Sequence, residues 1–372
     1  MSEAKSKANM LHTLHYKRNL DEVLERLCAL YARRTSDRIL ASFQVPSRAL
    51  RTFAIEHAEG FCDYPDPEER IRFWDAFLAE RRDLEDDSIP CAYLSEFDQG
   101  LYGGLLGGEV QFMCHPENGW ISSMVPPLLQ DWSAFDILAF NTTHPWWQRY
   151  QRQLRVFVEG AEGRFGISHF ILINGLNLVF ELLGATRTYL SLIERPEMVE
   201  RAIEMAYALN LTVQRAFFET VPSLRGGTCS NMVQWMPGRI VSESVDPFHM
   251  TSVDYFERWG RAPVERILGQ FDGGVLHIHG NGRHLLEAVA TVRGLKAIYL
   301  GDDRAFPPAF EILGELRQRV GDIPLVVGMP WGPFVEALAR HELVGGVFYQ
   351  VSDAPSVAEA NRIMERVRVY RT

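Results

Sequence analysis

The sequence has few cysteines, and none of them stand in a recognisable pair. Its 372 residues include five cysteines, scattered along the chain without any Cys-x-x-Cys spacing. An odd and dispersed set of this kind excludes a disulfide framework and favours reduced thiols. Residues 1–20 are basic but lack the apolar core of a secretory signal. We therefore expect a cytoplasmic protein.

The sequence also lacks a surplus of positive charge and an unbroken long apolar run. Lysine and arginine number 38 against 48 aspartates and glutamates, which gives a formal net charge of −10. This balance argues against nucleic acid or an anionic membrane surface as a partner, because both select basic faces. One apolar stretch, residues 167–185, is interrupted by Asn174, Gly175, Asn177 and Glu181. It is predicted to be a strand, a polar turn and a helix rather than a membrane span.

Helical spacing marks the N-terminal part of the chain. Residues 19–34 carry apolar side chains at helical spacing from Leu20 to Leu30, which predicts an amphipathic helix. Residues 68–86 are predicted to form another helix after two prolines. We expect two parts, a helical extension over residues 1–36 and a main domain over residues 37–372.

Within the main domain, short apolar runs alternate with longer amphipathic segments. Strands that alternate with helices are typical of βαβ units with parallel strand pairing. Eight such runs favour a (β/α)8 TIM barrel, and an open sheet of six or seven strands is the alternative. The predicted strands are residues 38–45, 91–97, 169–174, 227–233, 274–279, 297–300, 325–327 and 346–351.

The ends of these strands supply the candidate functional residues. Active sites of (β/α)8 barrels lie at the carboxyl ends of the strands, in the loops that lead to the next helix. The candidate residues at or just after the strand ends are Arg48, Arg51, Asp98, Asn174, Asn177, Asn231, Gln234, His277, His279, Asn281, Asp302, Asp303, Met329, Trp331, Tyr349, Gln350 and Asp353.

His277 and His279 are the most distinctive of these residues. Side chains two apart in a strand project to the same face, so both imidazoles are expected to point into the barrel mouth. The next predicted strand ends in Asp302, which is a candidate third ligand. Two histidines and a carboxylate suit a catalytic Zn²⁺ or a non-haem iron. The alternative is that one histidine only hydrogen-bonds a substrate or a buried carboxylate.

Asp98 is a candidate catalytic carboxylate, together with Asp302. It closes the second predicted strand and precedes a glycine-rich loop. A carboxylate in that position predicts a general acid or a group that binds a cationic N–H. A helix-capping or turn aspartate is the alternative.

Substrate binding is assigned to Arg48, Arg51, Asn174, Asn281, Trp331 and Tyr349. Arginines in a barrel mouth would hold carboxylates in a bidentate manner, although a solvated helix face accounts for them equally well. The two aromatic side chains would form a wall for a flat or apolar substrate, and a place in the core is their alternative.

In their order along the chain, four segments resemble the uroporphyrinogen decarboxylase superfamily. They are DQGLYGGLLGGEV, HFILINGLNLVFELLG, VLHIHGNGRHLLEAV and GGVFYQVSDAPSVAEANRIMERV. The resemblance covers roughly residues 35–370 and implies a (β/α)8 barrel. The superfamily includes the decarboxylase itself, zinc methyltransferases that move methyl groups between a corrinoid and thiols, and cobalamin-independent methionine synthase.

Individual residues carry over from this resemblance with some departures. Asp98 matches the catalytic aspartate that holds the pyrrole N–H groups in the decarboxylase. His277 matches the first zinc ligand of the methyltransferases, and His279 stands where they usually have cysteine. Asp302 falls close to a carboxylate zinc ligand of the methionine synthase. The resemblance thus implies a zinc site that is richer in nitrogen and oxygen than is usual in the family.

These observations give one leading hypothesis for function and two alternatives. The leading hypothesis is a zinc-dependent methyl or alkyl transferase of the corrinoid methyltransferase type, which acts on a small molecule. The first alternative is a metal-free decarboxylase of uroporphyrinogen or a related pyrrole carboxylate, and the second is a non-enzymatic corrinoid-binding protein. The resemblance also implies a corrinoid as methyl donor, a corrinoid protein as partner and a homodimer as the assembly.

Overall fold

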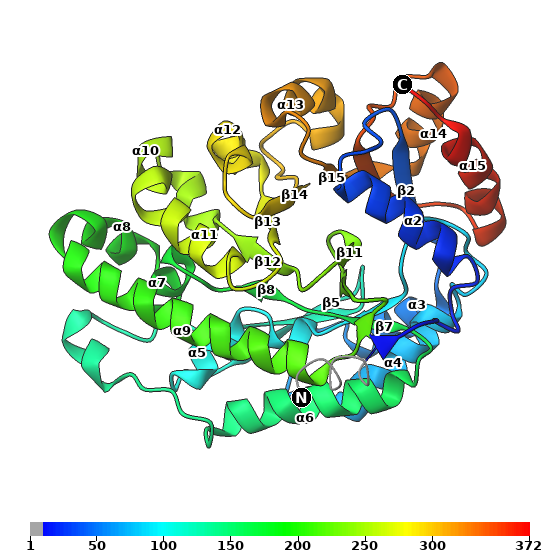
Figure 1. Ribbon diagram of the computed structural model, residues 1–372. Helices are drawn as coiled ribbons and strands as arrows, with labels where there is room; N and C mark the ends of the chain where they lie inside the picture. The colour runs from blue at the N-terminus through cyan, green and yellow to red at the C-terminus, as the bar shows by residue number, and fades with distance from the viewer. Residues whose placement is uncertain (1–9) are drawn as a thin grey trace, which may run out of the picture.

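A parallel sheet of seven strands forms the centre of the protein. The computed structural model describes residues 10–372, so residues 1–9 of the expected N-terminal extension lie outside the described residues. Neighbouring strands of the sheet all run parallel, and helices lie around its outside (Figure 1). In spatial order the strands are β2 (Ile39–Phe43), β16 (Val347–Ser352), β15 (Leu325–Pro330), β14 (Leu295–Leu300), β13 (Gly274–Ile278), β12 (Val241–Ser244) and β8 (Ile171–Leu172).

Two further parallel strands extend this arrangement. β4 (Cys91–Tyr93) pairs with β7 (Gly166–Ser168), and β7 is followed after two residues by β8. The stretch 167–185 is therefore β7, β8 and then the helix α7 (Leu176–Leu183), as its polar interruptions predict. No helix among residues 10–372 combines the length and the apolar character that crossing a bilayer requires. The predicted class, a mixed α/β fold with a parallel sheet, is confirmed.

The predicted fourth strand is wrong. Residues 227–233 contain β10 (Gly227–Ser230), which pairs antiparallel with β11 (Gln234–Pro237) in a small sheet with β1 (Met10–Leu11) and β9 (Ser223–Leu224). The fourth strand of the parallel series is β12, whose sequence is Val-Ser-Glu-Ser. β12 is only four residues long, and three of its side chains are polar. The sequence therefore has no apolar run at this position from which a strand could be predicted.

The free edge of β2 is covered by side chains. Among residues 10–372, β2 has one strand neighbour, β16. On its other edge the Ala41 N–H donates to Asp87 Oδ2 at 3.0 Å, and the Phe43 N–H donates to Asp86 Oδ2 at 2.8 Å. The Asp87 N–H in turn donates to the Ala41 carbonyl oxygen at 2.9 Å. The chain runs from these two aspartates directly into β4, so they bridge the space between β2 and β4.

Two apolar cores lie on the two faces of the sheet. The outer core places side chains such as Leu276, Ile298 and Val327 under the surrounding helices. Besides α2, which is described next, the helices of residues 10–372 are α3 (Arg48–Glu56), α4 (Pro67–Ala79), α5 (Gly100–Leu105), α6 (Pro145–Ala161), α7, α8 (Ala185–Glu194), α9 (Pro196–Thr220), α10 (Val253–Tyr255), α11 (Arg261–Leu268), α12 (Leu286–Ala290), α13 (Leu313–Val320), α14 (Trp331–Arg340) and α15 (Val357–Val369).

The inner core includes the N-terminal helix. α2 (Leu20–Tyr31) forms where the amphipathic spacing predicts it. Its buried side chains join Val275, Val326 and Phe348 from the inner face of the sheet and Trp235 from β11. The helix is therefore packed against the sheet within one shared core.

A third, antiparallel sheet lies beside α3 and α4. It consists of β3 (Phe61–Cys62), β5 (Gln111–His115) and β6 (Trp120–Met124). The turn between β5 and β6 carries Asn118, and Trp120 begins β6. Both of these residues line the cavity beside β2, β15 and β16 that is described below.

Candidate functional site

His277 and His279 lie side by side at the carboxyl end of β13. His277 shares the strand face of Val275, which belongs to the inner core, so its ring points to the inside of the sheet. The two ring centroids are 4.3 Å apart. A side chain at Gly301, at the end of β14, would come within 2.8 Å of His277 Nε2, so the glycine leaves room for this ring.

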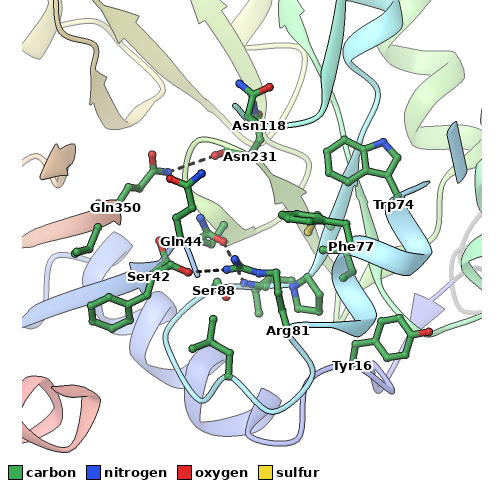
Figure 2. Close-up of a pocket in the computed structure, with 18 of the residues that line it drawn as sticks. Tyr16, Ser42, Gln44, Trp74, Phe77, Arg81, Ser88, Asn118, Asn231 and Gln350 are labelled. Carbon is green, nitrogen blue, oxygen red and sulfur yellow. Dashed lines mark hydrogen bonds between the residues drawn. The ribbon is translucent and has the colours of Figure 1, made fainter. Parts of the chain in front are cut away.

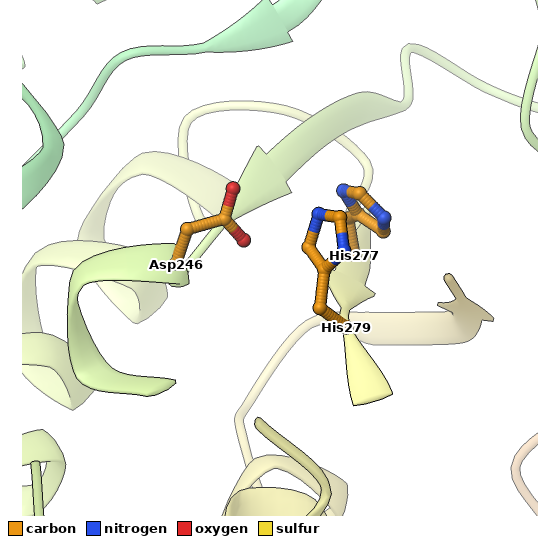
Figure 3. A group of neighbouring side chains, drawn as sticks. All are labelled: Asp246, His277 and His279. Atoms are coloured by element: carbon orange, nitrogen blue, oxygen red, sulfur yellow. The ribbon is translucent and has the colours of Figure 1, made fainter. Parts of the chain in front are cut away.

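The carboxylate next to this pair is Asp246. It begins the short helical turn η3 (Asp246–Met250) that follows β12. One ligand-type atom from each of Asp246, His277 and His279 lies within 4.8 Å of the others, and Figure 3 shows the three side chains facing a common space. Because the sequence pattern placed the fourth strand at residues 227–233, the end of β12 and its aspartate were not among the candidates.

Asp302, the carboxylate expected from the sequence, makes other contacts. Its Oδ1 accepts hydrogen bonds from Arg283 Nη2 at 2.9 Å and from the Ala309 N–H at 2.7 Å. These contacts tie the loop after β14 to the helical turn η5 (Gly280–Leu285). The structure thus brings Asp246, and not Asp302, into the group that could hold a metal ion.

Asp303, the next residue, orients His279. His279 Nδ1 lies 3.2 Å from Asp303 Oδ1, and Asp303 Oδ2 accepts the backbone N–H of Asn281 at 3.1 Å. A hydrogen bond donated by Nδ1 leaves Nε2 of His279 with its lone pair free for a ligand. A carboxylate behind a histidine is the usual support of metal-binding imidazoles.

Burial favours the neutral form of two imidazoles in this region, those of His277 and His249. Burial lowers the pKa of His277 to about 3, and the adjacent His279 lowers it further in the same direction. A third histidine, His249 of η3, is buried 5.8 Å from His279 between ring centroids, and burial lowers its pKa to about 4. Neutral imidazoles present the lone pairs that a metal ion requires.

The charge of Asp246 affects the pKa of Asp98. It follows β4 and the short turn η1 (Ser95–Phe97). Burial, and then the charge of Asp246, raise the pKa of Asp98 to about 7. Glu181 of α7 behaves in the same way, since burial and then the charge of Asp98 raise its pKa to about 7. Both carboxyl groups can therefore exchange a proton near neutral pH.

Four further predicted site residues, Arg48, Arg51, Trp331 and Tyr349, are not part of the group formed by Asp246, His277 and His279. Arg48 is 86% exposed in α3, 3.9 Å from Glu80, and Arg51 is also exposed on that helix. Tyr349 is buried, and its hydroxyl both accepts from the Val344 N–H and donates to the Val344 oxygen, each at 2.9 Å. Trp331 packs edge-on against Phe43, with ring centroids 5.6 Å apart. Neither Arg48 nor Arg51 lines the cavity beside β2, β15 and β16 that is described below.

The two predicted asparagines have mainly structural contacts. Asn174 is buried, and its Nδ2 donates to the Pro263 oxygen at 3.3 Å. Asn281 contributes its backbone N–H to Asp303, and its carbonyl oxygen lies 3.2 Å from His284 Nδ1. Among residues 10–372, the side-chain oxygens of both asparagines have no hydrogen-bond partner.

A cavity of about 400 Å³ lies beside the carboxyl ends of β2, β15 and β16. The inner face of these strands contributes Ser42, Gly328 and Gln350, and the turn between β10 and β11 contributes Asn231. Gln350 Nε2 donates to the Met232 oxygen at 3.1 Å, and it also contacts the Asn231 oxygen (Figure 2). The sequence pattern included Asn231, Gln234 and Gln350 among the strand-end candidates but assigned them no role.

Comparison with known proteins supports the fold alone. No family model matches the sequence, and no curated protein matches it. A methyltransferase from Methanosarcina mazei has a similar structure, with a TM-score of 0.59, over 93% of this chain and 98% of that chain. The two sequences are 15% identical, so the likeness shows a common fold.

Proposed function

We propose that this protein is a metal-dependent methyl or alkyl transferase of the uroporphyrinogen decarboxylase superfamily, with zinc held by Asp246, His277 and His279. The observation that carries the proposal is the convergence of these three side chains within 4.8 Å at the ends of two adjacent strands. The fold shared with a methyltransferase along almost the whole chain supports the choice of reaction class.

The proposal includes a complete (β/α)8 barrel. The strands β2, β4, β7 with β8, β12, β13, β14, β15 and β16 supply eight positions in chain order. β2 and β4 are not paired directly. Instead, Asp86 and Asp87, which precede β4, form hydrogen bonds with the backbone of β2. We infer that the barrel closes through these contacts.

The donor set fits a zinc ion. Two imidazoles and one carboxylate leave a position open, as in catalytic zinc sites. Two buried atoms, Nδ1 of His277 and Oδ1 of Asp246, have no hydrogen-bond partner among residues 10–372. Buried polar atoms normally have a partner, so these two atoms are available to a bound ligand. Asp303 supplies the supporting contact to His279.

The residues of the chain divide the chemistry among them. When bound, zinc supplies a Lewis acid that favours the ionised form of the acceptor nucleophile. Asp98, with its pKa near 7, takes up the proton that the acceptor releases. Asp303 keeps His279 in one orientation and one tautomer. We propose a corrinoid as the methyl donor, carried by a partner protein or free in solution.

Zinc content in matched variants tests the ligand set. We expect about one zinc per chain in parent protein from metal-replete expression, and at least tenfold weaker binding in His277→Ala, His279→Ala and Asp246→Asn. Asp302→Asn is the matched control and should keep its zinc, because Asp302 bonds Arg283 and Ala309 instead. A parent protein without zinc contradicts the metal site, and a loss confined to Asp302→Asn contradicts the role of Asp246.

Methyl transfer is tested with methylcobalamin as donor. Its demethylation can be followed optically with simple thiols, alcohols and amines as acceptors. We expect turnover in the zinc-loaded parent and loss of it in His277→Ala. Turnover that persists after complete zinc removal would refute the metal-dependent reaction.

A further inference from the structure

The cavity beside β2, β15 and β16 has an unusual balance of charge. Its polar lining is mostly uncharged and includes Ser42, Gln44, Ser88, Asn118, Asn231, Gln234 and Gln350. Two lining residues are charged, Lys17 and Arg81, and both are cations. None of the described lining residues is an aspartate or glutamate. This lining disfavours a cationic ligand.

The two cations differ in how they are neutralised. Lys17 is buried and pairs with Asp86 Oδ1 at 3.1 Å. The other oxygen of that carboxylate accepts the Phe43 N–H at 2.8 Å. The neighbouring Asp87 is occupied by Arg26, whose guanidinium approaches both of its oxygens at 2.7 and 3.0 Å. Asp86 and Asp87, which are not among the lining residues, are therefore both already engaged in ion pairs.

Arg81 has no carboxylate partner within salt-bridge distance among residues 10–372. Its Nη2 donates to the Phe43 carbonyl oxygen at 2.9 Å, and its guanidinium lies 5.6 Å from the centre of the Phe77 ring. Burial lowers its pKa, and the charge of Asp86 acts in the opposite direction. Figure 2 shows Arg81 next to Ser42 and Ser88 in the cavity wall. Because the bond to Phe43 is the only hydrogen bond that the Arg81 guanidinium donates among residues 10–372, several of its N–H donors are left for an incoming group.

We propose that this cavity binds a small organic anion whose carboxylate pairs with the Arg81 guanidinium. The amide side chains would contact further polar groups of the ligand, and the rings of Trp74, Phe77 and Trp120 would cover its apolar part. Arginine is suited to this role because its planar fork binds carboxylates in a bidentate manner. The inference rests on the cavity and not on the metal site, so it goes beyond the proposed function.

Gly328 offers a way to fill the cavity without disturbing the fold. It lies on the inner face of β15, opposite Gln350 in the strand ladder. A Cβ built at Gly328 has no heavy atom within 4 Å, so a side chain at this position starts in open space, and Gly328 lines the cavity. Gly328→Leu should therefore block the ligand and leave the zinc content unchanged.

Three probes of similar shape test the charge preference by titration calorimetry on the full chain. They are phenylacetate, phenylacetamide and 2-phenylethylammonium. We expect phenylacetate to bind at least about tenfold more tightly than the amide and the ammonium ion not to bind, since tenfold corresponds to about 1.4 kcal/mol. Equal binding of phenylacetate and its amide, or no binding of phenylacetate, overturns the proposal.

The variants locate the binding to Arg81. Arg81→Gln should lose the preference for phenylacetate, Arg81→Lys should keep part of it, and Gly328→Leu should bind none of the probes. Asp246→Asn should bind phenylacetate like the parent, which excludes coordination of the probe by zinc. If Arg81→Gln does not fold, an unchanged phenylacetate affinity in Gly328→Leu still refutes the assignment. Loss of binding in Asp246→Asn instead places the anion at the proposed metal.

Discussion

At the scale of single residues, Asp303 has the clearest indirect role. It contacts His279 through one carboxylate oxygen and the Asn281 backbone through the other. Asp303→Asn should keep the fold but weaken zinc binding about 10- to 100-fold, because the imidazole loses its anionic support. Competition with a chelating dye measures the affinity. Asp302→Asn, one residue away, is the control, and equal affinities in both variants would argue against this role.

Asp98 should make the stability of the metal-free protein depend on pH. Its pKa rises from 3.8 to about 7 on folding, so the folded state holds its proton more tightly than the unfolded state. The stability that this proton confers is complete below about pH 4 and is lost as the pH rises through about 7. Asp98→Asn should therefore gain about 1–3 kcal/mol of unfolding free energy relative to the parent between about pH 4 and pH 8.

Urea unfolding at several pH values measures this difference. Asp131 provides a control of opposite sign, because hydrogen bonds from the Ser133 hydroxyl and backbone lower its pKa. Its contribution is present above the unfolded pKa and is lost as the pH falls through the folded one. Asp131→Asn should thus be less stable than the parent at neutral pH and equal to it in acid. If the difference in unfolding free energy between Asp98→Asn and the parent does not change with pH, the pKa of Asp98 is not shifted by folding, and the prediction is wrong.

At the scale of elements, the edge of β2 depends on buried carboxylates. Asp87 accepts the Ala41 N–H at 3.0 Å and pairs with Arg26, and its side chain is 1% exposed. Asp87→Ala should lower the free energy of unfolding by about 3–5 kcal/mol, because the partly buried Arg26 guanidinium loses its carboxylate and the Ala41 N–H loses its acceptor. Glu336→Ala, in an exposed helical pair with Arg340, should change it by about 0.5 kcal/mol or less. Similar losses in both variants would contradict this account.

At the scale of the whole molecule, α2 closes the inner core. Leu27 is fully buried among residues that come from α2, the central sheet and β11. Leu27→Ala should cost about 2–5 kcal/mol, as expected for a cavity in a packed core. Glu25→Ala, on the exposed face of the same helix, should change stability by about 0.5 kcal/mol or less. Denaturant unfolding should give one transition, and a separate early transition for Leu27→Ala would mean that α2 unfolds on its own.

The sequence by itself determined the parallel α/β class, most strands, and the adjacency of His277 and His279. These features rest on local periodicity, since apolar alternation and a spacing of two residues act within a single element. The N-terminal helix was predictable for the same reason, because its apolar stripe lies within twelve residues.

The tertiary structure alone decided which residues surround the histidines and the cavity. Asp246 reaches the pair because β12, a short and polar strand, lies next to β13 in the sheet. Asp302 and Asp303 are neighbours in sequence, yet one bonds Arg283 and the other His279. The nearby carboxylates of Asp86 and Asp87 pair with Lys17 and Arg26, and neither forms an ion pair with Arg81. Each of these contacts depends on how distant segments of the chain pack together, and the spacing of residues within one segment does not predict that packing.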